Sequence, residues 1–140
     1  MRRLLTSAKF RALVSALAGF FGYGSWGFWV NMSHGWQTGL KAGLTQGSYS
    51  FVITLFYSVL IEWMYAKTGN KILTTVFCSL SVVVTSYSIH ALVGTPEILA
   101  TIAPGVVIGS FFVYGYTSVL AATVAKPEIA SGSAGKQGEH

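Results

Sequence analysis

The sequence predicts an all-α integral membrane protein, in which four transmembrane helices form a bundle with packing seams of glycine and other small residues. The first observation behind this is composition: 52% of the 140 residues are hydrophobic and only 9% are charged, whereas roughly a quarter of a soluble domain is charged. The second is the presence of four apolar runs, each long enough for the ~20 residues that a helix needs to cross a bilayer. The third is a four-residue spacing of small side chains within these runs, which is typical of helices that pack closely in lipid.

The first span is predicted at about residues 12–32, after a start that is rich in arginine and lysine. A basic start before an apolar run also fits a signal peptide, with Ala16–Ala18 as an A-x-A cleavage site. That site leaves only about six apolar residues before it, fewer than the roughly seven to fifteen of a signal peptide, so a spanning helix is the better interpretation. One face carries a stripe of small residues that is a candidate partner for the second span: Ala12, Ser15, Gly19 and Gly22.

The second span, predicted at about residues 39–65, is expected to be the central helix of the bundle. One of its faces carries glycines at four-residue steps and then weakly polar side chains, at the period of an α-helix. Bulky apolar groups occupy the other faces, which suits lipid because small groups let another backbone come close. The predicted helix-packing residues are Gly35, Gly39, Gly43, Gly47, Ser50, Thr54 and Ser58.

The third span, predicted at about residues 72–93, is rich in hydroxyl side chains. The run Val82–Val84 alone favours a strand, but a lone strand in lipid leaves its backbone unpaired, so a helix is predicted. Small and polar residues follow alternating four- and three-residue steps, which predicts one face packed in a left-handed bundle. These residues are Thr74, Cys78, Ser81, Thr85 and Ser88.

The fourth span is predicted at about residues 97–124, after a Gly-Thr-Pro-Glu sequence that is typical of a helix start. Pro104 lies inside this span and predicts a kink near residues 100–104, because proline has no N–H to donate. Gly105 and Gly109 repeat the four-residue spacing and are further predicted helix-packing residues.

The four spans make one transmembrane domain, residues 1–125, followed by a tail at residues 126–140. The tail is rich in glycine, serine and alanine, a composition that predicts a flexible cytoplasmic segment. With a cytoplasmic N-terminus, eight of the nine Lys and Arg residues fall on the cytoplasmic side and only Lys41 falls outside. This bias predicts that both termini are cytoplasmic, and a bacterial inner membrane is the expected location.

Two ionisable side chains in the spans form the candidate ion or proton site, because ionisable groups in a membrane are functional candidates by default. Glu62 lies near the inner end of the second span, and His90 lies near the outer end of the third. The plainer interpretation of Glu62 is an interfacial carboxylate that pairs with Lys67 or Lys71.

A metal site on the outer side is the alternative use of the histidines. His34, His90 and Glu97 all fall on that side, and two histidines with a carboxylate suit a divalent metal. Their spacing is unlike that of a local pair of ligands on one helix. The sequence therefore predicts no metal site, and it predicts no cofactor.

No catalytic pattern accompanies these residues, so the chain is not expected to be an enzyme. There is no G-x-S-x-G, no phosphate-binding loop and no paired acidic motif, and the chain contains no aspartate. A lipid-modifying enzyme would need more acid–base groups than four glutamates and three histidines at these places. The basic residues lie at the ends of apolar runs, which indicates membrane topology rather than nucleic-acid binding.

Two functions remain, and the sequence favours the first. It predicts a non-enzymatic accessory or assembly component of a membrane complex, in contact with lipid and with other membrane subunits or further copies of itself, because packing seams outnumber ionisable groups. The alternative is a small oligomeric transporter or channel that uses Glu62 and the hydroxyl-rich third span. The size and the four-span plan resemble those of the small multidrug transporters, but those carry a carboxylate deep in the first span and this chain has none there.

Overall fold

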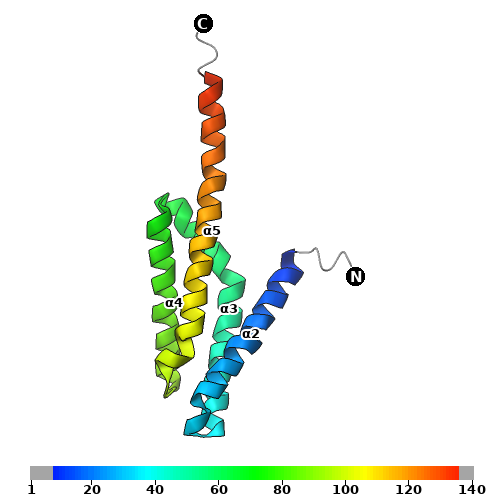
Figure 1. Cartoon of the computed structure of the whole chain (residues 1–140), viewed down its shortest axis with the longest axis vertical. Helices are drawn as coiled ribbons and strands as arrows, with labels where there is room; N and C mark the ends of the chain where they lie inside the picture. Colours follow the sequence, from blue (N-terminus) through cyan, green and yellow to red (C-terminus); the bar gives the residue numbers. More distant parts are fainter. Residues whose placement is uncertain (1–7, 136–140) are drawn as a thin grey trace.

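The computed structural model describes residues 8–135, apart from the side chains of residues 8, 9, 11 and 125–135. Four helices in this part of the chain are long and apolar enough to cross a membrane, which confirms the predicted number and is consistent with an integral membrane protein. Short connections join them in an up-and-down order (Figure 1). The elements are α2 (Ala8–Asn31), the single 3-10 turn η1 (Met32–His34), α3 (Trp36–Thr68), α4 (Lys71–Val93) and α5 (Ile98–Gly135).

Helices α3 and α5 each contact the other three long helices, whereas α2 and α4 make no contact in the described residues, and the most extensive contact is that between α2 and α3. Helix α2 lies beside α3 near the α2–α3 connection and leans away from α4 and α5 toward its N-terminal end (Figure 1). We call the end of the bundle formed by residues 31–35 and 94–97 the tight end. We call the half of the bundle beside residues 12–23 of α2 the open half.

Glycines end α3 and α4 where the chain turns back. Gly69 and Gly94 adopt left-handed φ values of 58° and 73°, and their N–H groups bond back to carbonyls of the last helical turn, Tyr65 O and Ala91 O. A side chain at either position is strained in that conformation, so glycine is the usual residue there. Both turns therefore reverse the chain within a few residues and place consecutive helices side by side.

The hydrophobic core lies among α3, α4 and α5, on the side of the bundle away from α2. It consists of Tyr57, Ile61, Cys78, Val82 and Val113, all less than a tenth exposed. The hydroxyl of Tyr57 donates to the backbone carbonyl of Cys78, so the one polar atom of this tyrosine is paired inside the core. Three helices thus share a packed interior that α2 does not enter.

The buried face of α4 differs from the predicted one in its second half. Burial follows four-residue steps through Thr74, Cys78, Val82, Ser86 and His90. The predicted face, with alternating steps of four and three, included Thr85 and Ser88, which are exposed and bond to carbonyls of their own helix. Of these two, Thr85 still reaches α3, because its Oγ1 lies 2.7 Å from the hydroxyl of Tyr49. Residues at steps of four lie along a line that turns around the helix, unlike residues at alternating steps of four and three. Steps of four are the spacing found where membrane helices cross closely.

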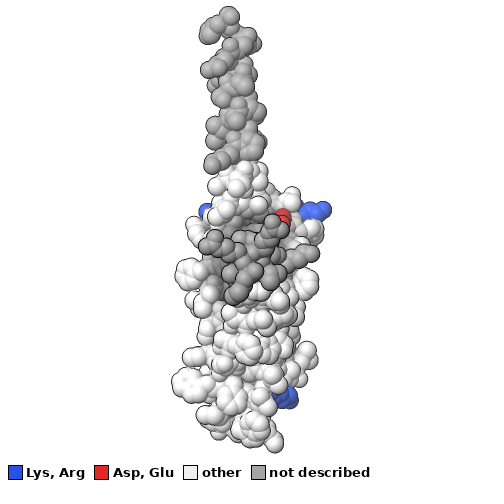
Figure 2. Space-filling model, turned by 90° about the vertical axis from the view of Figure 1, so that its right-hand side faces the viewer, with Lys and Arg blue, Asp and Glu red and all other residues white. Residues whose placement is uncertain are grey.

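The surface of the described chain is largely uncharged. Figure 2 shows one face of the molecule, on which blue and red atoms occur only near the two ends of a broad white body. Large apolar side chains are exposed on all four helices, among them Phe21, Phe56, Leu92 and Phe111. Such a surface suits lipid or other membrane helices rather than water.

The last helix continues past the predicted end of the fourth span. Helix α5 runs without interruption through Pro104 and on to Gly135, and Figure 1 shows its C-terminal part extending beyond the other helices. The predicted flexible tail at 126–140 overlaps this part, and residues 136–140 lie outside the described chain. Both the flexibility of the tail and a kink at Pro104 remain predictions.

Candidate functional site

The glycines of α3 lie directly against the backbone of α2. A β-carbon at Gly43 would lie 2.6 Å from the carbonyl oxygen of Gly24, and one at Gly39 or Gly47 would lie 2.8 or 2.7 Å from a carbonyl oxygen of α2, that of Phe28 or Phe20. No side chain fits at these distances without movement of one backbone. Weak Cα–H···O=C contacts recur where helices approach this closely.

The face of α2 in this contact is not the predicted one. The carbonyls come from residues 20, 24 and 28, whereas the predicted stripe contained Ala12, Ser15, Gly19 and Gly22. Of that stripe, Gly19 does lie against the predicted α3 seam: a β-carbon placed on it would be 3.4 Å from Thr54 Oγ1 and 3.9 Å from Ser50 Cβ, whereas Gly22 has nothing within 4 Å. The glycines of α3 thus lie nearest to backbone carbonyl oxygens of α2, including that of Gly24, and not to the small side chains of the predicted stripe.

Not every predicted packing residue lies in the α2–α3 contact. Gly35 has φ 105° and forms the turn before α3, so it serves the backbone and not the helix contact. On α5, a β-carbon at Gly105 would lie 3.3 Å from Gln46 Nε2, and Gly109 has nothing within 4 Å. Ser50 is buried and Ser58 is half-buried on α3. The importance of these residues for association stays a prediction.

His90 is fully buried at the tight end and bonds to one residue of α3 and to one residue of the α4–α5 connection. Its Nδ1 lies 2.8 Å from Thr95 Oγ1, and its Nε2 lies 2.7 Å from Gln46 Oε1. Gln46 is on α3 and Thr95 follows α4, so the imidazole joins α3 to the α4–α5 connection. Both ring nitrogens are used within the chain.

Asn31, also fully buried, joins the end of α2 to the start of α5. Its Nδ2 donates to Gly27 O at 2.8 Å and lies 2.7 Å from Thr101 Oγ1. Its Oδ1 accepts from the backbone N–H of Glu97 at 3.1 Å. The first N–H groups of a helix have no partner inside it, so this amide supplies from α2 what the start of α5 lacks.

Pro104 leaves a second backbone group free, and α2 uses it. In an uninterrupted α-helix the carbonyl of Ala100 would accept from the N–H of residue 104, which proline does not have. The indole Nε1 of Trp26 donates to this carbonyl at 2.9 Å. The break in the hydrogen-bond ladder of α5 thereby becomes an attachment point for α2.

The three groups considered for a metal do not come together. His34 Nε2 lies 3.0 Å from Glu97 Oε1, both side chains being about half exposed, while His90 is occupied by Gln46 and Thr95. In the described residues no group of three His, Cys, Asp or Glu side chains could hold a metal ion.

Glu62 pairs with a tyrosine of α5 rather than with a lysine. The hydroxyl of Tyr116 donates to Glu62 Oε1 at 2.5 Å, and no ion pair joins Glu62 to Lys67 or Lys71 in the part of the chain that the structure describes. The ammonium of Lys71 lies 4.6 Å from the ring centre of Tyr114 instead. Glu62 and His90, predicted as one candidate site, lie in separate hydrogen-bonded groups.

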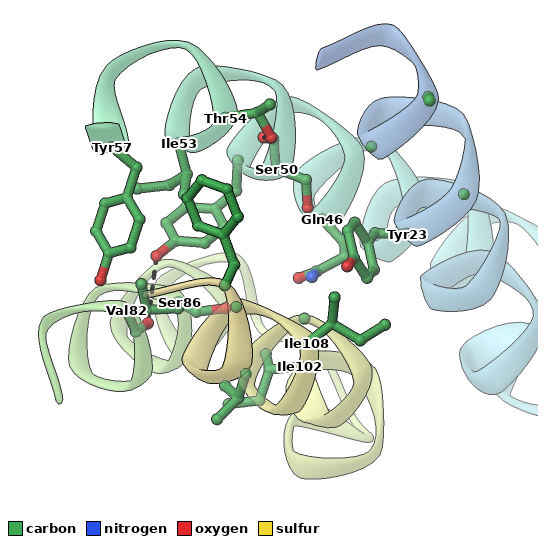
Figure 3. A pocket seen from close by; sticks show the side chains of 18 of the residues that line it. Tyr23, Gln46, Ser50, Ile53, Thr54, Tyr57, Val82, Ser86, Ile102 and Ile108 are labelled. Carbon is green, nitrogen blue, oxygen red and sulfur yellow. Dashed lines mark hydrogen bonds between the residues drawn. The ribbon is translucent and has the colours of Figure 1, made fainter. Parts of the chain in front are cut away.

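A cavity of about 600 Å³ lies among the four helices and opens toward the open half. Residues of all four helices line it, and none of the lining residues is charged. Figure 3 shows Gln46, Ser50 and Tyr57 of α3 on one side, with Tyr23 of α2 and Ile102 of α5 around the same space. Its size falls in the range of about 300–1,000 Å³ that is typical of small-molecule sites.

Sequence reasoning missed the partners of the ionisable groups. Asn31, Gln46 and Trp26 each bond across helices, and none of them was a candidate. An amide inside an apolar run was the signal available for Asn31 and Gln46, since buried amides in membranes need partners. Nothing in the sequence assigned the partners, which lie 44 to 74 residues away along the chain.

Comparison of the chain with protein-family models, curated proteins and solved structures finds no match. The four long apolar helices are consistent with a polytopic α-helical membrane protein.

Proposed function

We propose that this protein is a non-enzymatic accessory or assembly component of a membrane complex, built on a four-helix bundle with glycine packing seams. Its partners would be other membrane subunits, or further copies of the chain, in contact through lipid-facing helix surfaces. No catalytic role is assigned to any residue.

One observation carries this proposal: the polar side chains that could serve transport or catalysis are bonded to other helices of the same chain. His90, Asn31 and Glu62 each connect two helices. Interhelical hydrogen bonds in membranes contribute about 0.6 kcal/mol on average, so several together orient helices. Groups engaged in this way support a structural role, and the exposed apolar surface on every helix supports contact with other membrane segments.

The alternative is a small oligomeric transporter or channel, which the cavity favours. Glu62 also borders a second hollow of about 470 Å³ between α3 and α5, away from the tight end. The hydroxyl-rich helix α4 contributes less than this function needs, because only Val82 and Ser86 of α4 line the larger cavity.

Orientation belongs to the same proposal. Both termini are placed in the cytoplasm, in a bacterial inner membrane, on the basis of the distribution of Lys and Arg. Gln37→Cys, at the tight end, should then react with a membrane-impermeant maleimide on intact cells. Ala66→Cys, near the other end of α3, should react only after permeabilisation, and the reverse pattern would invert the assignment.

Purification in mild detergent tests the accessory role. A stoichiometric unlike membrane subunit should copurify with the tagged chain, and vesicles containing the chain alone should carry no proton or cation flux. A self-oligomer without any other subunit, with flux that Glu62→Gln abolishes while the bundle stays folded, would replace the accessory role by the transporter.

A further inference from the structure

The cavity has features of a ligand site that the accessory role does not require. We propose that it binds a neutral lipid whose head group carries a carbonyl oxygen, with Gln46 Nε2 donating to that oxygen and the apolar wall holding the hydrocarbon chain. One amide donor and two serine hydroxyls border the cavity, and the rest of its wall is largely apolar.

The donor is the amide nitrogen of Gln46. This side chain is only 2% exposed, and its Oε1 is fixed by His90 at 2.7 Å, so Nε2 is the atom left to face the cavity. A β-carbon at Gly105 would lie 3.3 Å from Nε2, which shows that the amide reaches the α5 wall through the space a glycine leaves. Nε2 has no hydrogen-bond partner among the described residues, and Figure 3 shows the amide at the edge of the open space.

Two serines repeat this feature on neighbouring walls. Ser50 of α3 and Ser86 of α4 are 7% and 2% exposed, and neither hydroxyl has a hydrogen-bond partner in the described part of the chain. Serines in membrane helices ordinarily bond to a carbonyl one turn back, as Ser88 and Ser118 do here. These three polar atoms are not enclosed by protein but border the cavity; among the described residues Thr75 Oγ1 is the fully enclosed side-chain polar atom without a partner. A molecule in the cavity can therefore supply the partners that the amide nitrogen and the two hydroxyls lack.

The chemistry of the walls restricts that molecule. The amide nitrogen of Gln46 only donates, so the ligand atom opposite it must be an acceptor. The serine hydroxyls can donate to the same acceptor oxygen. No charged side chain lines the cavity, which disfavours a charged head group because nothing would replace its hydration. Glycines and aliphatic side chains form most of the remaining wall, among them Gly19, Gly22, Ile53, Val106 and Gly109. A hydrocarbon chain fits such a wall.

A helix of a partner subunit is the other occupant to consider, but its backbone suits the unpaired amide of Gln46 less well. The carbonyls of a helix already accept an N–H of the same helix, although a second donor can share one of them, as Tyr57 does at the carbonyl of Cys78. A lipid carbonyl satisfies the amide directly.

Photoaffinity labelling tests the site in the full-length protein, reconstituted in bilayers of ether-linked phospholipids that contain no ester carbonyl. The probe is a long-chain ketone with a diazirine in its tail, and the labelled peptides should come from the cavity walls on α2 and α5. A long-chain methyl ketone should compete about fivefold better than the matching alkane, the difference expected for one hydrogen bond. The labelling is then repeated in ester-linked bilayers. If the ester carbonyls of the membrane lipids occupy the site, labelling should fall; if a separate lipid supplies the carbonyl, labelling should stay the same.

Three glycine variants provide a matched set. Gly22 and Gly109 line the cavity and have nothing within 4 Å, so Gly22→Leu and Gly109→Leu should fill it without a clash at the β-carbon and reduce labelling at least fivefold. Gly115→Leu is the control, because Gly115 is equally open but does not line the cavity. A melting curve in detergent verifies that each variant is folded, and two filling variants guard against the failure of one.

The donor has its own variant. Gln46→Met keeps the length of the side chain but cannot donate, so the ketone should lose its advantage over the alkane while the alkane competes as before. Equal competition by ketone and alkane in the wild type would overturn the carbonyl assignment. Undiminished labelling in both filling variants would overturn the site itself.

Discussion

The tight end and the open half of this bundle are built from the same helices but by different means. At the tight end, buried polar side chains tie α2 to α5 and α3 to the α4–α5 connection, through Asn31 and His90. In the open half, α2 leans away and leaves the cavity between itself and the other helices.

The comparison shows how a membrane bundle can fix one end and leave space at the other. Lipid tails are as apolar as leucine side chains, so apolar side chains alone do not draw helices together in a bilayer. Close backbone contact and hydrogen bonds do. The hydrogen bonds that join α2 to α5 lie toward the tight end, whereas the close contact of α2 with the α3 glycines extends from Phe28 to Phe20. At Gly22 of α2 and Gly109 of α5, by contrast, an added β-carbon would have nothing within 4 Å, and both residues line the cavity.

The largest effect is expected where the two backbones touch. Gly43→Leu should separate α2 from α3, because its β-carbon would lie 2.6 Å from Gly24 O, and the loss of stability should reach about 3 kcal/mol. Gly22→Leu, on the open side of α2, should cost little. Thermal melting in detergent measures both, and equal destabilisation would remove the distinction between the two regions.

Asn31 comes next, since it serves three partners at the tight end. Asn31→Leu should destabilise the bundle by about 1–2 kcal/mol, because Glu97 N–H and Thr101 Oγ1 each lose a partner. A double-mutant cycle with Thr101→Val should show coupling between the two positions. Strict additivity would mean that the Asn31–Thr101 contact contributes nothing.

A smaller effect, with a specific signature, is expected for Trp26. Trp26→Phe should cost about 1 kcal/mol, because the carbonyl of Ala100 loses its donor. In a Pro104→Ala background the helix can supply that donor itself, so the same substitution should be nearly silent. The four melting temperatures test this, and a cost for Trp26→Phe that is the same in both backgrounds would show that the indole stabilises by packing alone.

Glu62→Gln is expected to have the smallest effect on stability, below ~1 kcal/mol. The Glu62–Tyr116 pair is exposed, and a glutamine carbonyl still accepts from the tyrosine hydroxyl. Tyr116→Phe is the matched control and should behave alike. A large loss of stability in either variant, measured by the same melting assay, would show that the Glu62–Tyr116 pair, and not the tight end, holds the helices together.

The helices of the fold could be predicted from the sequence, but the contacts between the helices could not. Composition and run length identify four spans because each depends on local residues only. The four-residue glycine spacing predicted a packing seam on α3, which stays a prediction; Gly39, Gly43 and Gly47 lie close to carbonyl oxygens of residues 28, 24 and 20. The spacing could not choose the face of α2, because every helix has such carbonyl oxygens.

The site was less accessible to such reasoning. His90 stood out as an ionisable group, but its partner Gln46 lies 44 residues earlier and becomes a neighbour only when α3 and α4 pack. The buried stripe of α4 was misplaced in its second half because the crossing of two helices sets which spacing is buried. The cavity has no local signal at all, because it results from the tilt of α2.

Hydrogen bonds fix α2 to α5 at the tight end and not in the open half. Pulsed EPR distances in bilayers test this with two spin-label pairs in a Cys78→Ala background: Ser33 with Leu99, and Leu13 with Val119, all exposed positions. We expect a single narrow distance distribution for Ser33–Leu99 and a broader one for Leu13–Val119, with Asn31→Leu broadening the first. Equal widths for the two pairs, or a first distribution that Asn31→Leu leaves unchanged, would contradict it.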